Sequence, residues 1–372
     1  MPYNRVVPAD WESRLENWLA HGVIDADAAE RIRVWERGQA RTQGLRWPTL
    51  LALVCGAVLL CAGVLLFVSA HWDQLSPTQR ISVVLLAVAS FHAGGAAVAG
   101  RFEALSVAMH AVGTVALGAG IATAGQVFNL REHWPSAVLL WAMGATFGWL
   151  LLRHWTQAAI AAILAPWWLA GEWVARHPND TLPVAAGVCA LSFTYLSARR
   201  SAADCALRKA LGWIGGLALL PAAAITAADS WMGTPFQSDD LPAWALAAGV
   251  PVGLAFLMRG RDMLWNAAAV FWTLVLAALA GGRADSLGVY FWCAIGSVGL
   301  SLCGIHDGRP ERINLGIAAF ACTVFAFYFS SVMDKLGRSA SLMGLGVLFL
   351  GGGWVLERTR RRLMAHIRGE AA

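Results

Sequence analysis

PTLLALVCGAVLLCAGVLLFVSAHWDQLSP, residues 48–77, is the stretch of sequence that decides the class of this protein. Leu50–Ala70 is an apolar run of more than 20 residues without a charge, and the group His71-Trp72-Asp73 follows it. That length matches the hydrocarbon core of a bilayer, and tryptophan is typical of the lipid–water boundary. The stretch therefore predicts a membrane-spanning helix that ends at this boundary.

The composition of the whole chain agrees with a helical membrane protein. Hydrophobic residues make up 58% of the 372 residues and charged residues 14%, whereas soluble domains contain about 25% charged residues. The 19 Trp and 38 Gly fit interfacial anchoring and close helix packing. The basic residues behind the net charge of +5 gather at the chain ends and in alternate loops, which indicates membrane orientation rather than a nucleic-acid partner.

The seven cysteines form no CxxC pair, and six of them lie inside apolar runs. We expect buried thiols rather than disulfides or a metal site, and no cofactor. The first 46 residues are polar and basic, so we expect no cleavable signal peptide. Leu50–Ala70 would then act as an uncleaved signal anchor.

Residues 1–46 are predicted to form a small helical hairpin on the cytoplasmic side. Four apolar residues of the first helix share one face, as do three of the second: Trp11, Leu15, Trp18 and Leu19, then Ala28, Ile32 and Trp35. Gly22 is expected to end the first helix and Asp25 to cap the second. Because two short helices bury little surface, we expect the hairpin to bind a protein partner. An interfacial role on the membrane surface is the alternative.

Twelve apolar runs follow, and each is predicted to span the membrane. They cover residues 48–70, 79–99, 105–128, 135–152, 155–175, 182–198, 210–228, 241–258, 263–281, 286–305, 313–332 and 339–356. The distribution of Lys and Arg supports this count, because 22 of the 28 fall on the N-terminal side of the membrane and 6 on the other. The positive-inside rule therefore places both termini in the cytoplasm, and the basic tail after residue 356 with them.

Apart from Arg80 at the very start of the second run, the predicted spans contain one formal charge, Glu172 near the outer end of the fifth run. Ion-coupled carriers keep ionisable groups near the membrane midplane, so this scarcity argues against that class. The sequence also contains no Walker loop, no HExxH motif and no GxSxG motif. Nothing in it therefore predicts a known catalytic centre.

Polar and aromatic residues nevertheless gather where the first, third and fifth spans reach the outer side. We call this set the predicted outer rim: Trp72, Asp73, Gln126, Asn129, Arg131 and Glu172. The rim offers acid–base groups for a shallow site, and Asp73 is expected to pair with Arg131 or to cap the next span. The alternative is an ordinary interfacial belt with helix caps.

His92 and His110 form the second candidate site. They lie in consecutive spans, roughly 10 and 8 Å from the inner ends, so contact between them is possible. Two histidines without a third ligand are a weak metal signal, and intramembrane hydrogen bonding is the better explanation.

Three motifs make the chain resemble the bacterial membrane-protein family DUF2157. They are WLAHGVID with AERI (residues 18–32), GVLLFVSAHWDQLS (63–76), and GQVFNL (125–130) followed by Trp141. The sequence departs from the family at His71, where an Asn is common. The resemblance implies a four-span membrane core over residues 47–153 after the N-terminal module, and it brings no catalytic residues. Residues 154–372 would add about eight spans and the basic tail.

These observations predict an all-α polytopic helix bundle in the bacterial cytoplasmic (inner) membrane, surrounded by lipid. The preferred function is a non-catalytic membrane component, such as a scaffold, a sensor or an envelope partner, and not an enzyme. One alternative is a translocator of a lipid or apolar solute. The other is an enzyme acting on a lipid or envelope precursor.

Overall fold

A computed structural model describes most of the chain. The described residues are 10–42, 55–56, 59, 75–128, 133–199, 205–228, 241–280, 287–332, 346–347, 350–351, 354 and 358. They divide into two compact units, residues 1–113 and 114–372. The boundary falls within one continuous helix, α5 (Glu103–Val127).

The fold is all-α, as predicted, and no strand occurs among the described residues. Every expected span from 79–99 to 313–332 coincides with a helix. Eight helical segments of the described chain are long and apolar enough to cross a membrane, and one of them, Leu241–Ala280, comprises two helices in succession. The first and last expected spans, 48–70 and 339–356, fall almost entirely outside the described residues.

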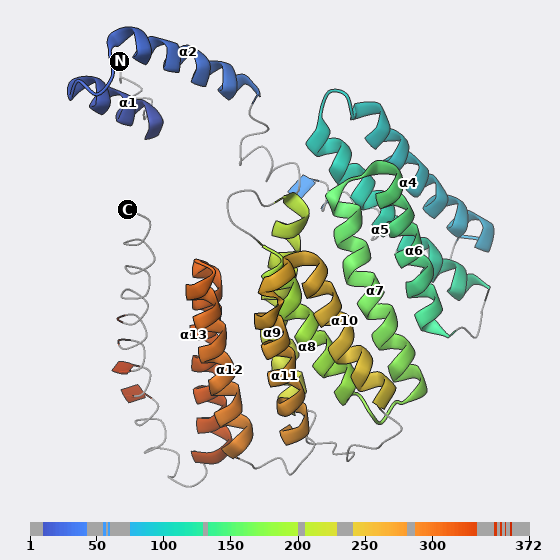
Figure 1. Ribbon diagram of the computed structural model, residues 1–372. Helices are drawn as coiled ribbons and strands as arrows, with labels where there is room; N and C mark the ends of the chain where they lie inside the picture. Colours follow the sequence, from blue (N-terminus) through green and yellow to red (C-terminus); the bar gives the residue numbers. More distant parts are fainter. Residues whose placement is uncertain are drawn as a thin grey trace. The chain divides into compact units, whose positions relative to one another are not determined.

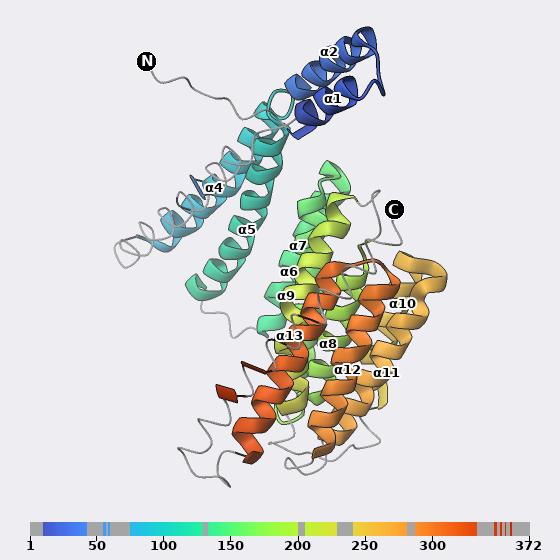
Figure 2. The ribbon, with the colours of Figure 1, turned by 90° about the vertical axis from the view of Figure 1, so that its left-hand side faces the viewer.

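The N-terminal hairpin consists of α1 (Asp10–Ala20) and α2 (Ala26–Thr42), which run side by side in Figure 2. Gly22, at φ +66°, makes the turn, and the Asp25 carboxylate accepts the Ala28 amide at 2.6 Å. Both roles were expected for these residues.

The expected packing of this hairpin was wrong in part. Leu15 and Ala29 are buried, but the side chains of Trp18 and Trp35 are 48% and 61% exposed. The two helices have only 11 and 17 residues, and both indoles lie outside the contact that buries Leu15 and Ala29. The side chain of Trp11 lies outside the described part.

Helix α4 (Pro77–Val98) and the first part of α5, up to Gly113, form an antiparallel pair in the first unit. Ser76 caps α4: its hydroxyl accepts the Gln79 amide while the Gln79 side chain accepts the Ser76 amide. This capping box fills the position for which the sequence also offered Asp73, a residue outside the described part.

The second unit is a bundle of consecutive helical hairpins (Figure 1). Its elements are α6 (Trp134–Leu152), α7 (Trp155–Arg176), α8 (Leu182–Ser197), α9 (Ala206–Ala228), α10 (Leu241–Arg259), η4 (Gly260–Asp262), α11 (Met263–Ala280), α12 (Leu287–His306), α13 (Pro310–Phe327) and the π-turn η5 (Tyr328–Val332). The pairs α6–α7, α8–α9 and α12–α13 pack most extensively.

Helix α8 is the centre of this unit, in contact with α9, α10 and α11. It has 16 residues, and twelve of them are buried, from Pro183 to Ser197. Two of its hydroxyl groups donate to backbone carbonyls: Ser192 to Val188 at 2.7 Å and Tyr195 to Ala162 of α7 at 2.6 Å. These two buried hydroxyl groups are therefore satisfied within the protein.

Candidate functional site

Two members of the predicted outer rim lie in the described part of the chain. Gln126 is exposed near the end of α5, and Glu172 is a mostly buried residue of α7. Trp72, Asp73, Asn129 and Arg131 lie outside the described residues, so the rim as a set stays a prediction.

Glu172 is held by three side chains. Its Oε2 lies 2.8 Å from Nε2 of His133 and 2.9 Å from Nη2 of Arg176, and its Oε1 accepts the indole N–H of Trp168 at 3.1 Å. The Glu172 side chain is 16% exposed, whereas those of His133 and Arg176 are 45% and 66% exposed. Both carboxylate oxygens are thus engaged, although a His–carboxylate pair open to water could also transfer a proton.

Local packing brings Glu172 to His133. His133 directly precedes α6, and the indole of Trp134 lies against Gly171, the residue before Glu172. A side chain at Gly171 would occupy the space of that indole, so the glycine sets how closely α6 and α7 approach here. The contact ties the start of α6 to the end of α7.

The histidine pair is in contact. The Nδ1 atoms of His92 in α4 and His110 in α5 lie 3.0 Å apart, and their ring centroids are 5.2 Å apart. One ring donates and the other accepts, so the bond requires opposite tautomers or a single shared proton. No group of three His, Cys, Asp or Glu suited to a metal ion occurs among the described residues. Helix-to-helix hydrogen bonding accounts for the pair.

A glycine on the facing helix makes room for each ring. A Cβ at Gly113 in α5 would lie 2.8 Å from the ring of His92, and a Cβ at Gly95 in α4 would lie 3.0 Å from the ring of His110. Each histidine is three residues before the glycine of its own helix, as HAGG at 92–95 and HAVG at 110–113. This shared His-Ala-x-Gly pattern was the sequence signal for the contact, and it was missed.

The structure also assembles an ion network that sequence reasoning missed. Asp307, between α12 and α13, pairs with Arg259 of α10 at 2.7 Å and with Arg312 of α13. Arg259 also donates to Asn266 of α11 at 2.8 Å, and His306 Nδ1 lies 2.9 Å from Asp307. We call these five residues the Asp307 network. It joins four helices at one end of the bundle.

Both arginines of the network are nearly inaccessible, with side chains 5% and 2% exposed. Burial by itself raises the pKa of Asp307. The hydrogen bond with His306 and the positive charges of Arg312 and Arg259 outweigh burial, so the pKa lies below its ordinary value of 3.8. The carboxylate is therefore ionised at neutral pH. We had interpreted the arginines only as orientation signals, because each follows or precedes an apolar run.

The comparisons with known proteins agree with the membrane assignment. Residues 16–157 match the family described as "Predicted membrane protein (DUF2157)". The resemblance is thereby confirmed over less than half of the chain, a part that contains the histidine pair and His133 but neither Glu172 nor the Asp307 network. No curated protein and no solved structure matches the chain.

Proposed function

We propose that this multi-pass membrane protein is a non-catalytic component of the bacterial inner membrane that binds a protein partner through its N-terminal hairpin. In this proposal both termini and the hairpin lie in the cytoplasm. The observation that carries it is the exposure of Trp18 and Trp35 on a small, charged module. Exposed large apolar side chains outside a membrane span are typical of binding surfaces, and tryptophan is enriched at the energetic centres of interfaces.

The bonding of the ionisable groups near the membrane supports a structural rather than a catalytic role. The partners of Glu172 lie on the preceding and the following turn of its own helix and at the residue before α6. His92 and His110 bond to one another across two helices. We therefore propose that Glu172, His92 and His110 connect neighbouring helices.

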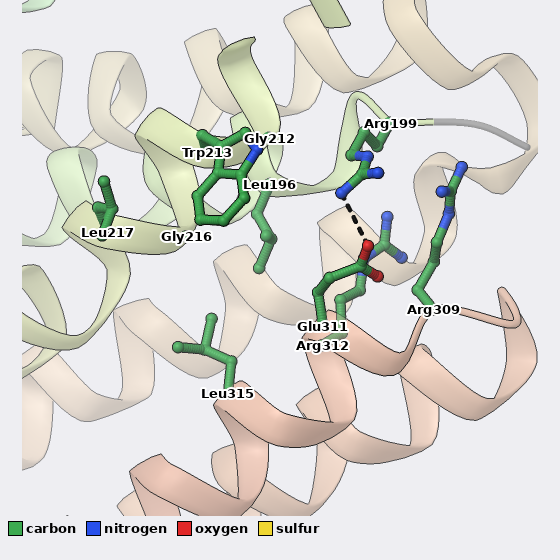
Figure 3. A pocket seen from close by; sticks show the side chains of 10 residues that line it. All are labelled: Leu196, Arg199, Gly212, Trp213, Gly216, Leu217, Arg309, Glu311, Arg312 and Leu315. Atoms are coloured by element: carbon green, nitrogen blue, oxygen red, sulfur yellow. Dashed lines mark hydrogen bonds and ion pairs between the residues drawn. The ribbon is translucent and has the colours of Figure 1, made fainter. Parts of the chain in front are cut away.

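A translocator of a lipid or apolar solute is the second candidate. It is favoured by a cavity with an apolar floor between α8, α9 and α13 (Figure 3). An enzyme acting on a lipid or envelope precursor is the third, since the His133–Glu172 pair could serve as its acid–base group.

The test is co-purification from native membranes after chemical cross-linking. We would compare the full-length protein with the double variant Trp18→Ser/Trp35→Ser and with Glu16→Gln, a matched change at an exposed polar residue of α1. Loss of a central tryptophan costs about 2 kcal/mol or more, so recovery of the partner should fall by about thirtyfold or more in the double variant. Glu16→Gln should leave it unchanged.

Deletion of residues 1–40 provides the complementary measurement. The truncated protein should still insert into the membrane, because the predicted spans begin after this segment. If it retains every cross-linked partner of the full chain, the docking role is wrong. If both tryptophan substitutions release the hairpin from lipid vesicles but leave partner recovery intact, the hairpin is an interfacial anchor instead.

A further inference from the structure

The cavity between α8, α9 and α13 has two chemically different parts. Its volume is about 210 Å³, and its floor is apolar, formed by Leu196 of α8, Trp213 and Leu217 of α9, and Leu315 of α13. Figure 3 shows these side chains on one side and a group of arginines on the other. A site of this kind matches a ligand with a charged end and an apolar end.

The charged part contains more arginines than carboxylates among its described residues. Arg199, Arg309 and Arg312 line the cavity together with one carboxylate, that of Glu311, which accepts from Arg199 at 2.8 Å. The neighbouring Arg259–Asp307 pair adds one charge of each sign, so arginines outnumber carboxylates by two among the described residues of this region. An anion with more than one acceptor oxygen suits such a group of guanidinium donors.

One of these donors has no bonding partner within the described part. Nη2 of Arg312 is buried and makes no hydrogen bond, although Nη1 of the same guanidinium bonds to Asp307 and to Cys303. A buried donor left without a partner costs about 1–3 kcal/mol. An anion among the arginines would offset part of this cost through its charge, while Nη2 itself stays closed to solvent.

The charged part of the cavity lies at the helix ends, and the apolar part lies further along the helices. Arg199 and Arg309 follow α8 and precede α13, at the ends of apolar helices, whereas Trp213 and Leu217 lie further along α9. The side chains of Trp213 and Leu217 are 66% and 74% exposed, as expected for a helix face that meets lipid. The charge pattern places the arginines at the cytoplasmic boundary.

The geometry points to a binding site for one anionic phospholipid. Its phosphate lies among Arg199, Arg309 and Arg312, and one acyl chain runs over Trp213 and Leu217 toward the membrane interior. This inference does not depend on the docking role of the hairpin. It predicts selectivity for an anionic headgroup and a requirement for an attached acyl chain.

Native mass spectrometry of the full-length protein in detergent tests the site. Dioleoylphosphatidylglycerol and dioleoylphosphatidylcholine would be titrated against the wild type, Arg199→Gln/Arg309→Gln and Arg261→Gln. Arg261 is an exposed arginine of η4 outside the cavity and serves as the matched control. About 1 kcal/mol per basic residue corresponds to about fivefold weaker binding of the anionic lipid for each arginine removed, with no change for phosphatidylcholine.

A second variant tests the apolar floor. A Cβ at Gly216, which lines the cavity, would meet only Leu196 Cδ1 at 3.4 Å, so the backbone there has room for a side chain and Gly216→Leu would extend into the floor. It should lower retention of the anionic lipid to the level of phosphatidylcholine. This variant decides the question if the double arginine variant is not recovered as a single species.

Two results would overturn the proposal. One is equal retention of the anionic lipid by Arg199→Gln/Arg309→Gln and Arg261→Gln, or by Gly216→Leu and the wild type. The other is displacement of the lipid by sn-glycerol 3-phosphate at comparable concentration, which would make the cavity a site for a soluble phosphate. No effect of glycerol phosphate, with the losses given above, supports the lipid site.

Discussion

Removing the carboxylate of Asp307 should lower the stability of the bundle. It is the carboxylate that faces the two nearly inaccessible arginines Arg259 and Arg312. Paired, these charges add little to stability, because desolvation offsets their attraction. If Asp307 is removed, the two buried arginines keep their charges without a partner, and this lowers the free energy of unfolding strongly.

We therefore expect Asp307→Asn to destabilise the protein by about 3 kcal/mol, with little change in composition or size. Asp262→Asn, at an exposed aspartate of η4, is the matched control and should be nearly silent. Thermal or denaturant unfolding of both variants in detergent measures the difference. Equal midpoints for the two variants would mean that the network contributes nothing.

The effect of Asp307 should also depend on pH. Its folded-state pKa lies below 3.8, the ordinary value that applies after unfolding. The stabilising contribution is therefore fully present above pH 3.8 and is lost as the pH falls through the lower folded-state value. The difference between wild type and Asp307→Asn should be constant from pH 7 to about pH 5 and should shrink below pH 4. A difference that disappears already near pH 6 would implicate a histidine instead.

At the scale of elements, α4 and α5 are matched through their His-Ala-x-Gly segments. The two helices are antiparallel, so the same four-residue pattern meets itself in reverse, and each ring lies over the glycine of the other helix. The hydrogen bond fixes both rings. Neither ring can move far without breaking it.

Gly113→Ala should destabilise this pair by about 1–3 kcal/mol, because the new methyl group would lie 2.8 Å from the bonded ring of His92. Gly94→Ala is the matched control, since its methyl group meets only the flexible end of Met109, which can move aside. Hydrogen exchange of the α4 and α5 amides measures both. Faster exchange in both variants alike would show that any side chain in this region is disruptive.

The elements themselves could be predicted well from the sequence. Apolar runs predicted every helix from α4 to α13, although α8 is shorter than a membrane span, and Gly22 and Asp25 act where turn and cap chemistry put them. The contacts between elements were harder to predict, because they depend on which helices pack together and on which faces meet. The spacing pointed to His92 and His110, but the Asp307 network joins residues up to 53 positions apart that sit at helix ends. The predicted burial of Trp18 and Trp35 was wrong for a related reason. A shared helix face in the sequence does not show which of its residues the neighbouring helix covers.

At the scale of the whole molecule, the remaining prediction is topology. The segment 230–240 carries no Lys or Arg, and we expect it on the periplasmic side. In a chain stripped of its other cysteines, Ser238→Cys should react with a membrane-impermeant maleimide on intact cells. A second chain that keeps only Cys205, an exposed native cysteine just before α9, is the matched control, and it should react only after the inner membrane is permeabilised. The reverse pattern would invert every span assignment.

Helix α8 is surrounded by other helices of the protein rather than by lipid. Its 16 residues cover about 24 Å, short of the roughly 30 Å of a hydrocarbon core, and its neighbours hide most of its surface. Three of those neighbours, α9, α10 and α11, come later in the chain. During synthesis α8 therefore leaves the ribosome before α9, α10 and α11 have been made. Its enclosure is complete only once residue 280 has followed it into the membrane.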